Sequence, residues 1–98
     1  MPTTTQQLYQ KMKGGDSTAF DQLFHLYYQP LVHQAYKITQ NQVDAEEIVQ
    51  TVFVKFWTKK NQINIQDSVK AYLYRSVRNS CIDYFRQQKS KAQNQEKY

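Results

Sequence analysis

The sequence predicts an all-α fold, a compact bundle of about four helices, from its length, its composition and its lack of helix breakers. The 98 residues are enough for one small domain with a single core. Hydrophobic residues make up 40% of the chain and aromatic residues 14%, which argues against disorder. Two glycines and two prolines are too few for the many tight turns of an all-β fold.

The N-terminal unit, residues 1–15, is expected to be a short helix followed by a glycine break. The helix runs from about residue 4 to residue 13, and Gly14-Gly15 ends it by supplying the positive φ that a helix terminus favours. Asp16 or Ser17 then caps a second helix. The apolar residues of that second helix recur at helical spacing and are Phe20, Leu23, Phe24 and Tyr27.

Pro30 interrupts this helical pattern. Proline lacks a backbone N–H and disfavours helix in the residue before it, so the sequence predicts a kink or a break near Tyr28-Gln29. Because proline is also favourable in a first turn, the residues from Leu31 to Ile38 are expected to continue as a separate helical segment.

A further helix is predicted from about Gln42 to Lys59. Asn41, followed by Asp44 three residues later, resembles a capping box with Asp in place of Glu. Acidic residues in the first turns and Lys59-Lys60 at the end complement the helix dipole.

This helix carries more apolar surface than one core face needs. Its expected core stripe, flanked by Phe53, is Ala45, Ile48, Val49, Val52 and Phe56. Glu47, Gln50 and Val54 lie on the far side, with Glu46 and Trp57 beside them. Two interpretations stay open: either a partner covers this second side, or Trp57 covers the neighbouring helix.

The segment from residue 61 to 66 is the most loop-like stretch, with two Asn and two Gln around two isoleucines. Asp67 or Ser68 then caps the last helix, which is expected to reach about Lys89. The polar residues 90–98 are expected to form a fraying tail or the start of a linker.

The last helix is predicted to have a basic face opposite its core stripe of Val69, Leu73, Val77, Ser80 and Tyr84. The opposite face holds four cations, an amide and no acid, while Asp83 lies to the side; its members are Arg75, Arg78, Asn79, Ile82, Arg86 and Lys89. Such a face fits DNA, an acidic protein or a membrane surface.

Charge is also uneven along the chain. Residues 1–54 carry 3 basic and 5 acidic side chains, a net of −2, whereas residues 55–91 carry 9 basic and 2 acidic, a net of +7. A basic half is typical of a polyanion binder, but a Lys-rich solvated surface explains the charge alone equally well.

The residues give no basis for catalysis, a metal or a cofactor. His25 and His33 lack the spacing of a metal-binding pair, and Gly14-Gly15 lacks the Lys-Ser/Thr of a phosphate-binding loop. Cys81 lies at the edge of a core stripe and is interpreted as a small apolar residue. Without a signal peptide or an apolar run of membrane-spanning length, the protein is expected to be cytoplasmic, with no direct membrane insertion.

Three segments in order resemble the extracytoplasmic-function sigma factors of the sigma-70 family, in their region 2. The first is GDSTAFDQLFHLYYQPLVHQAYKITQN, with its Gly-Asp, Ala-Phe and Tyr-Tyr-x-Pro-Leu. The second is DAEEIVQTVFVKFW, and the third is SVKAYLYRSVRNSCIDYFRQQK. The resemblance implies that residues 16–89 form the region 2 helical domain of a transcription initiation factor.

The resemblance further implies that the helix of the second segment docks on the clamp coiled coil of the largest subunit of core RNA polymerase. The positions that carry this role over are Asp44, Glu46, Glu47, Ile48, Gln50, Thr51 and Val54. The family usually has Glu where this chain has Thr51, which removes one possible salt bridge and predicts modestly weaker docking.

The resemblance also implies that the last helix and the loop before it bind the non-template strand of the −10 promoter element. The loop would hold a flipped base, while the helix holds backbone and flanking bases, so that capture of melted DNA favours the open form without hydrolysis. The expected DNA-binding residues are Asn61, Gln62, Asn64, Gln66, Lys70, Arg75, Arg78, Asn79, Arg86 and Lys89.

A complete family member carries a second helical domain, region 4, for which the residues after Lys89 are too few. Either the chain is a fragment, which we favour, or it acts without that domain. The alternative function is a helical protein-interaction module, a target or decoy of an anti-sigma factor, that does not bind DNA. An anti-sigma factor is an expected partner in both cases.

Overall fold

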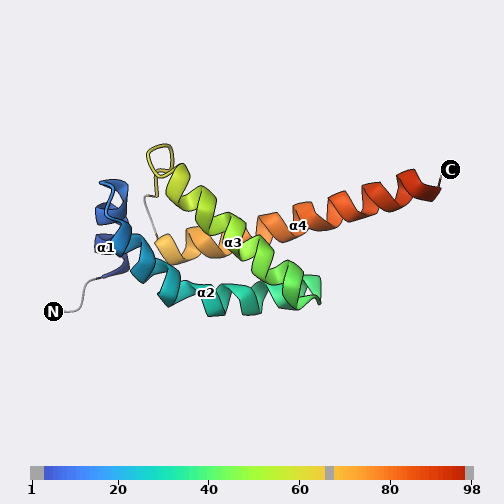
Figure 1. The fold of residues 1–98 in the computed structure, drawn as a ribbon, viewed down its shortest axis with the longest axis horizontal. Helices are drawn as coiled ribbons and strands as arrows, with labels where there is room; N and C mark the ends of the chain where they lie inside the picture. The colour runs from blue at the N-terminus through green and yellow to red at the C-terminus, as the bar shows by residue number, and fades with distance from the viewer. Residues whose placement is uncertain (1–3, 66–67, 97–98) are drawn as a thin grey trace.

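The computed structural model describes residues 4–65 and 68–96, with side chains described as far as Lys89. These residues form four helices and no strand (Figure 1). The helices are α1 (Thr5–Lys13), α2 (Ser17–Thr39), α3 (Gln42–Thr58) and α4 (Val69–Glu96). The predicted all-α bundle is therefore confirmed.

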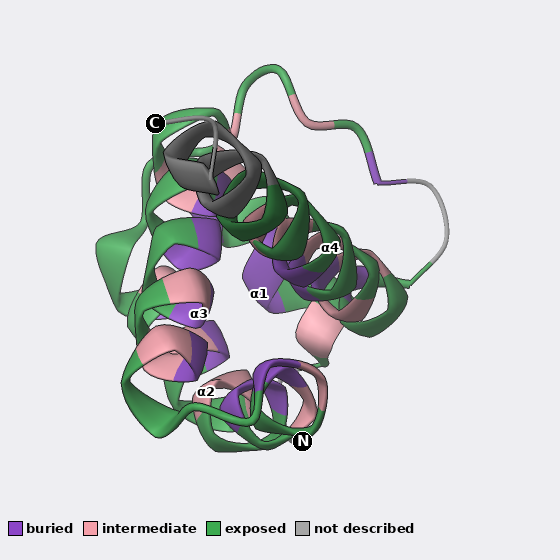
Figure 2. Cartoon of the chain, turned by 90° about the vertical axis from the view of Figure 1, so that its right-hand side faces the viewer, coloured by how far each residue is buried: buried purple, intermediate pink, exposed green. Residues whose placement is uncertain are grey.

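The core lies where the four helices face one another. Figure 2 looks along the bundle and shows the buried side of each helix turned inward. The largest fully buried side chains come from every helix and are Tyr9, Phe53, Phe56, Met12, Leu23, Leu31, Leu73, Val49, Val77 and Cys81. The core stripes predicted for α3 and α4 are buried here, except that Ile48, Ser80 and Tyr84 are only half-buried.

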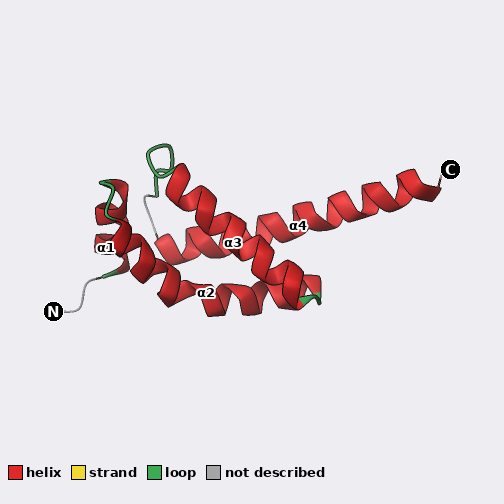
Figure 3. Cartoon of the chain, in the orientation of Figure 1, coloured by secondary structure: helices red, strands yellow, loops and turns green. Residues whose placement is uncertain are grey.

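The ends of α1 and the start of α2 follow local chemistry. The Thr4 side chain accepts a hydrogen bond from the Gln7 backbone N–H, which begins α1. After α1, the positive φ falls on Gly15, at 97°, as the glycine pair predicted. Asp16, rather than Ser17, caps α2. Figure 3 shows how short the resulting connection is.

The starts of α3 and α4 are also capped by side chains. Asn41 accepts from the Asp44 N–H, as predicted. The reciprocal half of the capping box is a wrong expectation, because the Asp44 carboxylate accepts from Tyr84 on α4 instead. Ser68 accepts from the Ala71 N–H and caps α4. Asp67, the other predicted cap, lies outside the described residues.

Pro30 does not end α2. The residues from Ser17 to Thr39 form one helix, so the predicted separate segment after Pro30 is wrong, although Figure 1 shows the helix changing direction near its middle. Pro30 and Leu26, whose carbonyl loses its helical partner, are both exposed. Solvent can satisfy that carbonyl, while Leu23 and Leu31 hold the two halves in the core.

The last helix is longer than predicted. It continues to Glu96, past the end expected at about Lys89. That segment contains no glycine or proline, and Lys, Ala, Gln and Glu are good helix formers. Figure 1 shows the C-terminal part of α4 projecting beyond the other helices, which gives the protein an extent of 59 × 25 × 21 Å.

Candidate nucleic-acid and protein interfaces

The outward side of α4 presents the predicted basic surface, because its opposite side is held in the core. All six residues expected on this surface are exposed: Arg75, Arg78, Asn79, Ile82, Arg86 and Lys89. Asp83 borders it and lies 3.8 Å from the Arg86 guanidinium, with both side chains largely exposed. An ion pair so open to solvent is weak, so another anion, such as a phosphate, can displace Asp83 from Arg86.

Lys70 is set apart from the other cations. It lies in the first turn of α4 and lines a hollow of about 350 Å³ together with Thr4, Thr5 and Tyr27. Its Nζ atom is 5.9 Å from the centre of the Tyr74 ring. The structure therefore places Lys70 beside the start of α1, on a different side of α4 from Arg75.

The loop before α4 exposes its amides and buries its isoleucines. Asn61, Gln62 and Asn64 are exposed, whereas Ile63 is half-buried and Ile65 is buried. The predicted loop residues are thus presented to solvent by apolar neighbours that anchor the backbone; Gln66 lies outside the described residues.

The outward side of α3 carries a mixed apolar and polar stripe. Val43 and Val54 are 70% and 59% exposed, and Glu47 and Gln50 lie between them on the same face. The Gln50 side-chain amide donates to the Tyr28 hydroxyl on α2 over 3.3 Å. Sequence reasoning missed Val43, although its position four residues before Glu47 was a usable signal.

The remaining predicted docking residues do not share that stripe. Ile48 and Thr51 face α4, and Glu46 is half-buried and accepts from the Gln42 side chain. Trp57 packs its ring on Phe20 of α2, with centroids 5.3 Å apart. This contact supports the interpretation that Trp57 covers a neighbouring helix.

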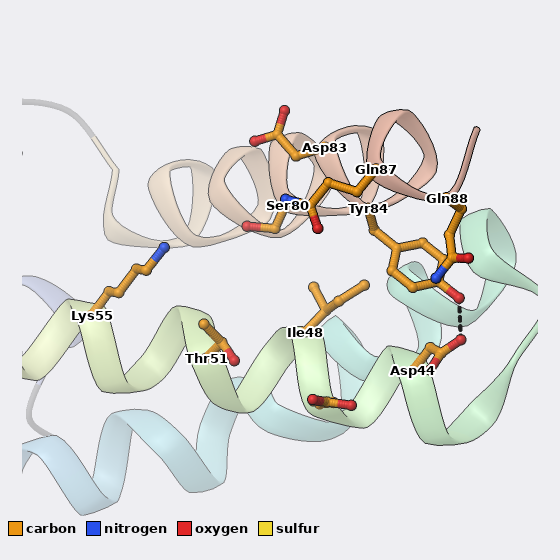
Figure 4. Close-up of a pocket in the computed structure, with 10 residues that line it drawn as sticks. Asp44, Ile48, Thr51, Lys55, Ser80, Asp83, Tyr84, Gln87 and Gln88 are labelled. Atoms are coloured by element: carbon orange, nitrogen blue, oxygen red, sulfur yellow. Dashed lines mark hydrogen bonds between the residues drawn. The ribbon is translucent and has the colours of Figure 1, made fainter. Parts of the chain in front are cut away.

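A cleft of about 450 Å³ separates α3 from α4 (Figure 4). Ile48 and Thr51 lie on the α3 side, across from Ser80. At one end the Tyr84 hydroxyl donates to the Asp44 carboxylate. This hydrogen bond, together with burial and the negative charges of Asp44 and Glu47, raises the pKa of Tyr84.

Other chemistry in the described residues is sparse. Burial raises the pKa of the Cys81 thiol, in keeping with the apolar role predicted for it. The described part of the chain contains no cluster of three or more His, Cys, Asp or Glu residues that could hold a metal ion. Nor does any helix in that part have the length and hydropathy needed to cross a membrane.

Comparison with known proteins points to one family. The family model for Sigma-70 region 2 matches residues 23–91. The ECF RNA polymerase sigma factor SigW of Bacillus subtilis (strain 168) is 28% identical over 79 residues, which cover 81% of this chain. They cover 42% of SigW, so the chain spans less than half the length of that relative. No solved structure was found to match.

Proposed function

The chain belongs to the sigma-70 region 2 family, and we propose that it acts in the cytoplasm as the polymerase-binding and promoter-binding domain of an extracytoplasmic-function sigma factor. In this role α3 docks on the clamp coiled coil of core RNA polymerase. The basic surface of α4 and the loop before it bind the non-template strand of the −10 element. The separation of these two surfaces on neighbouring helices is the observation that carries the proposal.

The stripe on α3 has the make-up of a protein-docking surface. Its two exposed valines offer apolar area, while Glu47 and Gln50 between them offer a charge and a hydrogen bond. An interface whose centre is apolar and whose polar groups fix orientation is the usual arrangement at specific contacts. The bond from Gln50 to Tyr28 holds the amide in place before a partner arrives.

The α4 surface and the loop bind different parts of single-stranded DNA. The exposed cations attract the phosphate backbone and supply salt-dependent affinity. The amides of Asn61, Gln62 and Asn64 can hydrogen-bond the edge of an unstacked base, which a duplex does not offer. Because melted DNA then binds better than duplex, binding shifts the promoter toward its open form.

Binding to core RNA polymerase tests the docking proposal. We expect the native chain to bind, and Gln50→Ala and Val54→Asp to weaken binding, the latter roughly tenfold or more because a charge replaces an apolar contact. Leu26→Asp is the matched control, since Leu26 is 53% exposed on α2, close to the 59% of Val54. Circular dichroism of each variant establishes that it is folded.

The outcome separates the two candidate functions. Equal binding of Val54→Asp and the native chain would exclude docking through α3. A native chain that binds neither the polymerase nor single-stranded DNA would point to the alternative, an interaction module covered by an anti-sigma factor. The sigma-factor function requires both activities.

A further inference from the structure

One side chain from α1 holds the loop that precedes α4. The hydroxyl of Tyr9 donates to the Ile63 carbonyl over 3.1 Å and accepts from the Ile65 N–H over 3.3 Å. Tyr9 is separated from these residues by 54 and 56 positions in the sequence. Tyr9 is 1% exposed, and its ring stacks against Phe56 of α3, with centroids 6.1 Å apart.

The two bonded backbone groups lie on either side of Asn64. The Ile63 carbonyl belongs to the peptide before Asn64, and the Ile65 N–H belongs to the peptide after it. Tyr9 therefore fixes both peptide planes that determine the backbone conformation of Asn64. The flanking isoleucines point toward the core, Ile65 being buried and Ile63 half-buried, whereas Asn64 is exposed.

The first half of the loop is held by a different element. The N–H groups of Gln62 and Ile63 both donate to the Lys59 carbonyl at the end of α3. The Tyr9 hydroxyl bonds the next backbone groups along the loop, the Ile63 carbonyl and the Ile65 N–H. Without it, a buried N–H at Ile65 would lose its partner, which costs more than the bond itself contributes.

We infer that Tyr9 is a positioning residue for DNA capture, which orients the Asn64 amide toward an unstacked base. This inference rests on the proposed promoter-binding function and assigns α1 a part in it. If the loop had to become ordered on binding, the free-energy cost of that ordering would lower the affinity of its amide for a base. A loop that is already fixed does not incur this cost. Tyr9 supplies the fixing without touching the DNA itself.

The test uses Tyr9→Phe, which keeps the stacked ring and removes only the hydroxyl. Tyr27→Phe is the control, because the Tyr27 hydroxyl also bonds α1, at Thr5 over 3.1 Å, but does not contact the loop. The probes are single-stranded DNA 12-mers that differ at one position, which holds each of the four bases or an abasic sugar. Scanning this position along the oligonucleotide finds where the native chain distinguishes the bases.

At that position, Tyr9→Phe is expected to weaken binding of the preferred base roughly three- to tenfold and to leave abasic binding unchanged. Tyr27→Phe should match the native chain with both probes. In an Asn64→Ala background, the effect of Tyr9→Phe should disappear. Equal discrimination by Tyr9→Phe and the native chain would overturn the inference, and so would equal losses on both probes.

Hydrogen exchange at the Ile65 amide tests the positioning step without DNA. The N–H should exchange faster in Tyr9→Phe than in the native chain or in Tyr27→Phe. Unchanged exchange would overturn the positioning role whatever the DNA results. A native chain that shows no base preference, with exchange behaving as expected, would instead refute the proposed base capture and with it the DNA role of Tyr9.

Discussion

The hydroxyl of Tyr84 on α4 donates a hydrogen bond to the carboxylate of Asp44 in the first turn of α3. The two residues are 40 positions apart, and their bond closes one end of the cleft between the helices. It joins the helix proposed to dock on polymerase to the helix proposed to bind DNA. The bond therefore links the two helices directly at the point where the cleft opens between them.

Tyr84→Phe should lower the stability of the bundle in a pH-dependent way. The pKa of Tyr84 is raised in the folded state, chiefly by its bond to Asp44. The stability that this bond contributes is thus fully present below the ordinary tyrosine pKa of about 10, and it is lost as pH rises through the raised pKa. Urea midpoints of the native chain and the variant should differ at pH 7 and converge as pH rises past the raised pKa of Tyr84. A gap that stays constant across that range would contradict this assignment.

Gln40→Gly should stabilise the protein. Gln40 ends α2 in the left-handed region, at φ 57°, where glycine has no steric cost. The expected gain is about 0.5–1 kcal/mol in the free energy of unfolding, reduced slightly by loss of the exposed bond from its side chain to the Lys37 carbonyl.

Gly15→Ala is the converse variant. Gly15 has φ 97°, and no atom lies within 4 Å of an added Cβ, so only backbone strain opposes the substitution. Its midpoint in urea should fall, while that of Gln40→Gly rises. Shifts in the same direction would show that left-handed backbone strain does not govern these two helix ends.

Cys81 should resist thiol reagents until the bundle opens. Its side chain is fully buried on α4, and burial raises its pKa, so both contact with the reagent and thiolate formation are suppressed. Labelling by a disulfide reagent at pH 8 should follow the rate of unfolding. A Cys81→Ala variant with Ile82→Cys moves the thiol to an exposed position one residue on and should label at once. Immediate labelling of the native chain would contradict the buried position.

The helices and caps were predictable because they depend on residues close in sequence. Asn41 and the glycine pair produce the ends that their local chemistry predicts, and the apolar spacing in α3 and α4 identifies the buried faces. The exposed state of the arginines on α4 followed from the same periodicity. These features need only the geometry of a single helix.

The features that the sequence did not predict are those determined by packing between helices or by exposure to solvent. Pro30 stays inside α2 because the Leu26 carbonyl that it leaves unpaired lies on the exposed side, while the core holds both halves of the helix. The local sequence pattern does not indicate this. That Ile48 and Thr51 line the cleft beside α4 is also a matter of packing, because it depends on where α4 lies. The contacts of Tyr84 with Asp44 and of Tyr9 with the loop join distant segments, so periodicity could not reveal them.

The salt dependence of DNA binding should identify which α4 cations contact phosphates. For single strands, the slope of log affinity against log salt changes by about 0.7 for each phosphate neutralised. Arg75→Ala and Arg78→Ala should each reduce the slope by about this amount. Lys37→Ala, an exposed cation near the end of α2, is the control and should leave the slope unchanged. If all three variants gave the native slope, the α4 surface would not lie on the DNA path.

Arg86 should behave differently from the other arginines, because its guanidinium lies 3.8 Å from the Asp83 carboxylate. A phosphate that binds Arg86 has to displace this acid, so part of the attraction is offset. Asp83→Asn removes the competing charge, so single-stranded DNA should bind a few-fold more tightly at low salt. The gain should vanish in an Arg86→Ala background, as measured by fluorescence anisotropy with a labelled oligonucleotide. A gain that persists without Arg86 would mean that Asp83 acts only through the overall charge of the surface.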